Sequence, residues 1–145
     1  MTGRIWDRLA PIFGRDVVFR DVDNIPLGVD FRETIQEALT HCRIFLAIIG
    51  REWLKVCDEK GRWRLESARD HVRIEIETAL ARRDLNIVPV LVRNASLPEP
   101  EELPATLERL CFINGYKVRG DPDFNHDMDR LISCIRSVLD ITDYG

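Results

Sequence analysis

The chain has 145 residues, of which 45% are hydrophobic and 32% are charged, and its formal net charge is −4 at pH 7. This length fits one domain with a proper hydrophobic core, and the composition is typical of a soluble, globular chain rather than a disordered one. The negative charge argues against a nucleic-acid scaffold, and the longest apolar run, IFLAIIG, is far shorter than a membrane span. We therefore expect one domain over residues 1–145, with neither a nucleic-acid nor a membrane partner.

The N-terminal stretch and the cysteines indicate a cytoplasmic protein. MTGRIWDRLAP lacks the apolar core of a signal peptide. The cysteines are scattered, without a CxxC pair or a nearby histidine pattern, so we expect neither a metal site nor disulfide bonds. They are Cys42, Cys57, Cys111 and Cys134.

Short apolar runs alternate with helical patterns along the chain. The first helical segment covers 3–13, where Pro11 is expected to end or kink the helix. The helix that starts after Asp30 has a capping box, because Glu33 follows three residues later. The predicted strands cover 16–19, 43–50, 86–92 and 111–113, and the other predicted helices cover 31–42, 70–83, 104–110 and 125–139.

Strands that alternate with helices predict an α/β fold, with a parallel sheet and helices on both of its faces. Ligands of such sheets bind outside the carboxyl ends of the strands. Two long loops, 20–30 and 51–70, are expected at that edge. Neither contains a glycine-rich phosphate loop, and the chain has no GxSxG or HExxH motif. Their acids and tryptophans are, from the residues alone, loop-organising and packing side chains.

The helix over 70–83 places one carboxylate in an unusual position. At about 100° per residue, Val72, Ile76, Ala79 and Leu80 share an apolar face, and Glu75 lies at the margin of that face. Glu77 is expected to point into water, and Ile74 to lie exposed opposite the apolar face. Glu75 is either a solvated edge residue paired with His71 or Arg82, or a functional acid for which Ala79 leaves room.

Several motifs in sequence order resemble the TIR domain family in its bacterial form. VFRDVDNIPLGVDFRETIQEAL is similar to the second sequence box and BB loop of that family. The segments CRIFLAIIGREWL, GRWRL, DHVRIEIETAL, NIVPVLV and FINGYKV follow at matching spacings. The resemblance covers about residues 3–139 and implies a flavodoxin-like fold.

The resemblance also implies an activity and the residues that serve it. Many TIR domains cleave NAD⁺ at the nicotinamide–ribose bond with a glutamate in an xxEI context, which is Glu75 in this chain. NAD⁺ would be the substrate, and no cofactor or metal is implied. Substrate-binding positions would be His71, Asp23, Ile25, Pro26 and Trp53, and the interaction loop would comprise Asn24, Ile25, Pro26, Leu27 and Gly28.

The sequence departs from the family pattern in two places. His71 stands where relatives often carry tryptophan or phenylalanine, and the usual first strand with its basic residue is missing before the first helix. Without that strand, 16–19 could pair directly with 43–50, a second chain could donate a strand, or the chain could be an N-terminally truncated TIR domain. We favour truncation.

Two functions from different classes remain. The first is an NAD⁺ glycohydrolase that is activated by self-assembly in prokaryotic, antiviral defence signalling. The second is a non-catalytic TIR interaction module that scaffolds signal transduction. The acid in the xxEI context favours the enzyme, and the missing first strand favours the module.

Overall fold

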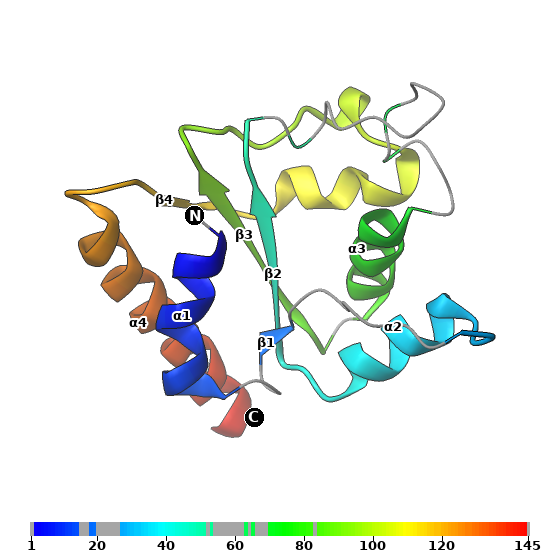
Figure 1. Cartoon of the computed structure of the whole chain (residues 1–145), viewed down its shortest axis with the longest axis horizontal. Helices are drawn as coiled ribbons and strands as arrows, with labels where there is room; N and C mark the ends of the chain where they lie inside the picture. Colours follow the sequence, from blue (N-terminus) through cyan, green and yellow to red (C-terminus); the bar gives the residue numbers. More distant parts are fainter. Residues whose placement is uncertain are drawn as a thin grey trace.

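The computed structural model describes residues 2–14, 18–19, 27–51, 53, 63, 65, 70–82 and 84–144. Figure 1 shows the elements along the chain. The α-helices are α1 (Thr2–Phe13), α2 (Phe31–Thr40), α3 (His71–Ala81) and α4 (Phe124–Tyr144). The strands are β1 (Val18–Phe19), β2 (Ile44–Ile49), β3 (Asn86–Val92) and β4 (Tyr116–Val118), and the 3₁₀ helices are η3 (Pro100–Glu102) and η4 (Ala105–Phe112).

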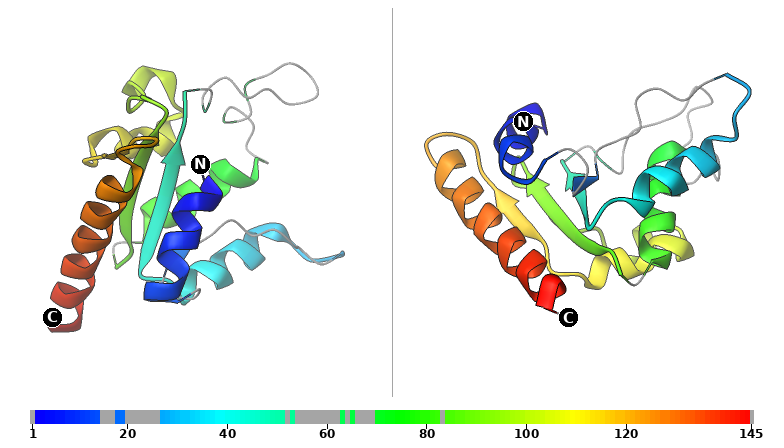
Figure 2. Two further views of the ribbon diagram at one scale, coloured as in Figure 1. Left: turned by 60° about the vertical axis from the view of Figure 1, so that its left-hand side comes forward. Right: turned by 90° about the horizontal axis from the view of Figure 1, so that it is seen from below.

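The strands of the described residues form one parallel sheet in the order β1-β2-β3-β4. One face packs against α2, α3 and η4, and the other packs against α1 and α4 (Figure 2). Since β2 and β3 are covered on both faces, they consist almost entirely of apolar residues. The predicted α/β architecture is confirmed. No helix in the described ranges is long and apolar enough to cross a membrane.

Strand β1 pairs directly with β2. Val18 lies opposite Ile44, and Phe19 lies opposite Phe45, in a parallel register. This is the first of the three arrangements considered from the sequence, in which the sheet closes without an intervening strand. The pairing satisfies backbone groups of Val18, which is buried, and unpaired groups at such a position would cost free energy.

The strand predicted at 111–113 is wrong. Residues 105–112 form η4, and the last strand is β4, four residues farther along the chain. The buried side chains of η4 are Leu107 and Leu110, at the three-residue spacing of a 3₁₀ helix, whereas Phe112 is 75% exposed. The apolar CFI run therefore ends a helix whose core contacts come from the preceding leucines.

Pro89 is accommodated inside β3 by the uneven pairing of this strand. β3 pairs with β2 from Asn86 onward, but its pairing with β4 starts only at Val90. On the β4 side, Pro89 therefore occupies an edge position, where a residue without an N–H is tolerated.

Side chains close the ends of the helices. The Asp30 carboxylate accepts a hydrogen bond from the Arg32 N–H (2.9 Å), which confirms its predicted role as N-cap of α2. At the other ends, arginines donate to the last carbonyl groups, where a cation also opposes the helix dipole. Arg82 donates to Leu39 O of α2, and Arg109 donates to Leu80 O of α3.

A buried carboxylate ties β4 to the start of α4. Asp127 is 3% exposed and accepts hydrogen bonds from the backbone N–H of Arg119 (2.9 Å) and from its guanidinium Nε (2.9 Å). The guanidinium beside it lowers the pKa of Asp127 from 3.8 to about 2. The charged carboxylate therefore stabilises the fold above about pH 4, and this contribution is lost as the pH falls toward the folded-state pKa.

Replacing Asp127 with asparagine is expected to lower the free energy of unfolding at pH 7 by roughly 1–3 kcal/mol, because the hydrogen bonds of Arg119 lose their charged acceptor. The variant should also lose less stability than wild type when the pH falls from 5 to 2. Thermal unfolding followed by circular dichroism measures both effects. Asp129→Asn is the control, since Asp129 is also on α4 but its carboxylate lies in an exposed pair with Arg8 of α1. Equal effects of the two substitutions would contradict this account.

Candidate functional site

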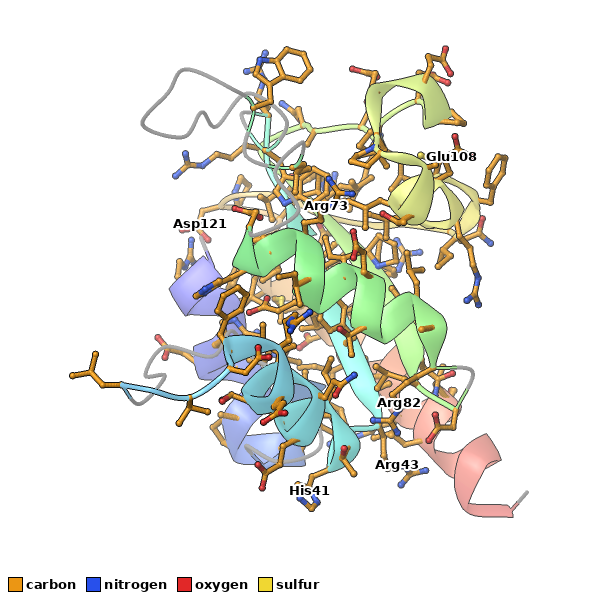
Figure 3. All side chains as sticks on the ribbon, turned by 90° about the vertical axis from the view of Figure 1, so that its right-hand side faces the viewer. His41, Arg43, Arg73, Arg82, Glu108 and Asp121 are labelled. Atoms are coloured by element: carbon orange, nitrogen blue, oxygen red, sulfur yellow. The ribbon has the colours of Figure 1, made fainter. Side chains whose placement is uncertain are left out.

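Helix α3 lies between α2 and η4 on one face of the sheet (Figure 3). Asp70 caps its N-terminus, because its carboxylate accepts a hydrogen bond from the Arg73 N–H (2.9 Å). Figure 3 places Arg73 near the start of the helix and Arg82 beyond its carboxyl end. The cap fixes where the helix begins, and therefore which residues of the first two turns face the core.

Glu75 is buried. Its exposed fraction is 4%, and Glu75 and Asp127 are the two buried charged residues within the described part of the chain. Carboxylates are seldom so enclosed, because burial of a charge costs free energy that specific interactions must offset. The solvated edge position considered from the sequence is therefore wrong for Glu75. Arg82, one partner considered for Glu75, donates to Leu39 O and pairs with Asp84 at 2.7 Å.

The expectation for Ile74, a neighbour of Glu75, is wrong. Ile74 is 7% exposed and packs in the same core cluster as Leu65 and Leu107, although the helical pattern placed it in water. The reason is that α3 is enclosed by α2 and η4, so that it buries more than one face. Ala79 has no exposed surface and packs in this cluster too.

Glu77 is held by two partners. Its Oε1 accepts hydrogen bonds from Arg73 Nε (2.6 Å) and from the Thr106 hydroxyl of η4 (2.8 Å). Its side chain is 31% exposed, so it is less solvated than the sequence suggested. The four-residue spacing of arginine and glutamate was a signal for part of this network. Thr106 lies 29 residues away, and nothing in the local pattern pointed to it.

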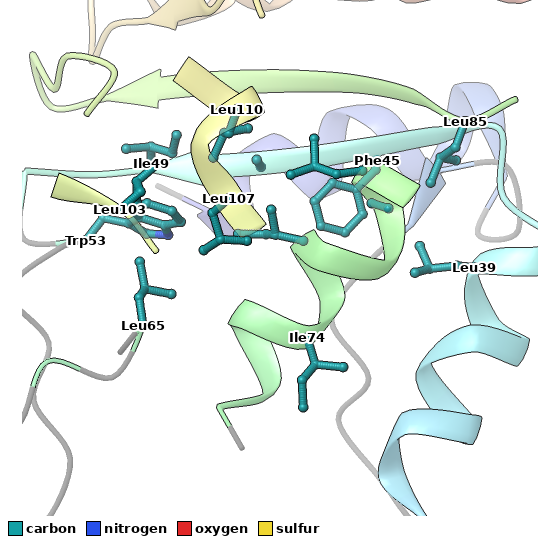
Figure 4. Packing of buried hydrophobic residues seen from close by; sticks show 14 of the residues in the cluster. Leu39, Phe45, Ile49, Trp53, Leu65, Ile74, Leu85, Leu103, Leu107 and Leu110 are labelled. Carbon is teal, nitrogen blue, oxygen red and sulfur yellow. The ribbon is translucent and has the colours of Figure 1, made fainter. Parts of the chain in front are cut away.

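The other expected site residues are placed as follows. His71 is exposed, and its ring lies 4.5 Å from the ring of Phe31 of α2, centroid to centroid. Trp53 is buried in the core beside Ile49 and Leu103 (Figure 4), which agrees with a packing role. Asp23, Asn24, Ile25 and Pro26 lie outside the described residues.

The described end of the interaction loop is apolar and exposed. Leu27 is fully exposed and Val29 is 45% exposed. Gly28 lies between them with a φ of +79°, a left-handed conformation that glycine adopts without strain. The loop therefore presents two apolar side chains on either side of a turn that favours glycine.

A pocket of about 300 Å³ opens beyond the carboxyl ends of β2 and β3. Gly50 and Trp53 line its β2 side, Asn94 and Ser96 line its β3 side, and Trp63 contributes a half-exposed indole. This is the edge at which open parallel sheets bind ligands. Glu75 is not among the residues that line this pocket. The structure thus brings Trp53 to the sheet edge and places Glu75 on the neighbouring helix.

No group of three histidine, cysteine, aspartate or glutamate side chains could hold a metal ion within the ranges that the structure describes. Cys42, Cys111 and Cys134 are not in disulfide bonds, and the Cys42 thiol donates a hydrogen bond to the Ala38 carbonyl (3.3 Å). Burial raises the pKa of the Cys111 thiol, and nearby glutamates, chiefly Glu99, add to this effect. A raised pKa disfavours the thiolate and makes Cys111 a poor nucleophile.

A parallel sheet with helices packed on both of its faces defines an α/β domain of the flavodoxin-like class. The family model for the TIR domain matches residues 4–132. The chain therefore belongs to the TIR domain family, as the sequence motifs predicted. No match is found among curated proteins.

Proposed function

We propose that this TIR domain is an NAD⁺ glycohydrolase in which Glu75 is the catalytic carboxylate. The observation that carries the proposal is the burial of Glu75, at 4% exposure, on α3 of a chain that belongs to this family. An enclosed carboxylate has a stronger electrostatic effect on a neighbouring cation than a solvated one, because less water screens it.

The chemistry needs one well-placed carboxylate. As nicotinamide leaves with the bonding electron pair, positive charge develops on the ribose, as in the cleavage of glycosides. Nicotinamide is already a good leaving group, so a general acid is not required. Glu75 would stabilise the developing charge and hold the ribose hydroxyls while water attacks the anomeric carbon. Glu77 cannot share this task, since Arg73 and Thr106 hold its carboxylate and it lies about 200° around the helix from Glu75.

The substrate contacts form the second part of the proposal. His71, one helical turn before Glu75, and Trp53 at the sheet edge are assigned to NAD⁺ binding together with Asp23, Ile25 and Pro26. The exposed ring of His71, which contacts Phe31, supports its part in this assignment. No cofactor is required, because NAD⁺ is itself the substrate.

Self-assembly would activate the enzyme through the loop that contains Leu27. A fully exposed leucine beside a second exposed apolar residue is unfavourable in water and supports docking on a second copy of the domain. The proposed setting is cytoplasmic antiviral defence signalling in a prokaryote.

The alternative is a non-catalytic module that scaffolds signalling through contacts between TIR domains. The same exposed Leu27 favours it, since docking needs no chemistry. Incubation of the protein with NAD⁺, followed by chromatography for free nicotinamide, separates the two candidates. Release of nicotinamide supports the enzyme, whereas self-association without any release supports the scaffold.

A further inference from the structure

Leu65, which lies between β2 and α3 in the sequence, is tied to α3. Arg73 of α3 donates a hydrogen bond from its guanidinium NH1 to the Leu65 carbonyl (3.0 Å). The Leu65 side chain is buried in the core cluster that also contains Trp53 and Ile74 (Figure 4). Arg73 therefore holds the backbone of Leu65 directly. Because the Leu65 side chain packs in the same cluster as Trp53, Arg73 also supports the packing of Trp53 indirectly.

The same guanidinium extends the connection to η4. Arg73 Nε donates to Glu77 Oε1 (2.6 Å), and this oxygen also accepts the hydroxyl hydrogen bond of Thr106 (2.8 Å). The four residues Leu65, Arg73, Glu77 and Thr106, which we name the α3 clamp, thus link α3 both to Leu65, eight residues before Arg73, and to η4, 29 residues after Glu77.

The contacts of the clamp are partly shielded from solvent. The side chain of Arg73 is 16% exposed, and that of Glu77 is 31% exposed. Charge-assisted hydrogen bonds in such surroundings are shorter and stronger than exposed ion pairs, which often contribute little. The fork of the guanidinium also serves two acceptors at once, which a lysine ammonium could not do with the same geometry.

The clamp lies on the side of α3 away from Glu75. Arg73 and Glu77 are each two residues from Glu75, which corresponds to about 200° around the helix axis. Contacts on this side therefore fix the rotation of α3 and, with it, the direction of the Glu75 side chain.

We propose that Arg73 is a positioning residue, which holds Leu65 and, through the packing of its side chain, Trp53 in place relative to the Glu75 face of α3. This inference rests on the proposed function, because Trp53 is assigned to NAD⁺ binding there. Arg73 does not contact substrate in this account; it sets the distance between two groups that do.

The test compares Arg73→Ala with Arg109→Ala. Arg109 donates to Leu80 O (2.7 Å) at the other end of α3, so its removal disturbs the same helix without touching Leu65. We expect Arg73→Ala to raise the KM for NAD⁺ at least about tenfold and to change kcat less than about threefold. The reason is that Trp53, which is assigned to NAD⁺ binding, is displaced, whereas the catalytic carboxylate of Glu75 is still present. Added guanidinium ion should restore the KM. Arg109→Ala should lower Tm and leave the KM unchanged.

Amide hydrogen exchange gives a readout that does not depend on activity. Exchange in the peptide that contains Leu65 should accelerate in Arg73→Ala and not in Arg109→Ala, since only the first substitution frees this segment. Equal KM shifts in the two variants, or unchanged exchange at Leu65, would overturn the inference. If the wild-type protein cleaves no NAD⁺, the proposed function fails, and exchange at Leu65 then decides alone whether Arg73 positions the segment.

Discussion

Replacement of Glu75 with glutamine is expected to lower the rate of NAD⁺ cleavage at least about 100-fold. The amide keeps the size of the side chain but loses the negative charge that would stabilise the ribose cation. Loss of one preorganised electrostatic group in an enclosed site typically costs about 3–4 kcal/mol of transition-state stabilisation. The measurement is the initial rate of nicotinamide release at saturating NAD⁺.

The matched control is Glu108→Gln. Glu108 is an exposed glutamate on η4, next to α3 (Figure 3), so its substitution makes the same chemical change on a neighbouring element. Its activity should stay within about twofold of wild type, as expected for a surface substitution. Comparable losses in both variants would show that Glu75 has no special role, and full activity of Glu75→Gln would exclude it as the catalytic carboxylate.

A second large effect is expected at the exposed end of the interaction loop. Leu27→Asp should lower self-association and NAD⁺ cleavage together, each at least about tenfold at protein concentrations near the association midpoint. Burial of a leucine contributes about 1.5–3 kcal/mol to an interface, and an acid at that position would be desolvated at a cost. Sedimentation velocity and the nicotinamide assay, run on the same samples, measure the two quantities.

Ile12→Asp is the control for this experiment. Ile12 is a 41% exposed apolar residue of α1, on the opposite side of the sheet from α2. The same change of charge and polarity there should leave association intact. An activity of Leu27→Asp that equals wild type and does not depend on protein concentration would contradict activation by self-assembly.

Local patterns in the sequence predicted the parts of the fold that depend on local physics. The apolar runs of β2 and β3 are covered on both faces, and Asp30 caps the helix that follows it, as the sequence predicted. Strand β4 was missed because CFI is as apolar as a short strand. Only the burial of Leu107 and Leu110 decides that this stretch belongs to a helix.

The candidate site was predictable in part. The margin position of Glu75 and the family motif both singled it out, but its burial depends on how α2 and η4 surround α3. The same enclosure explains why Ile74 was placed in water, since a helical pattern shows one apolar face and α3 packs on more than one. The contact between Thr106 and Glu77, 29 residues apart, has no local signature, and neither has the hydrogen bond of Arg73 to the backbone of Leu65.

The central claim is that this TIR domain cleaves the bond between nicotinamide and ribose. The most direct measurement is mass spectrometry of the products after the folded, self-associated protein has been incubated with NAD⁺ in water labelled with a heavy oxygen isotope. The account predicts nicotinamide in equal amount to an ADP-ribose product, with heavy oxygen in the linear form of that product and none in a cyclic form. NAD⁺ that remains intact in the presence of folded, assembled protein would contradict the claim and leave the scaffold as the function of the domain.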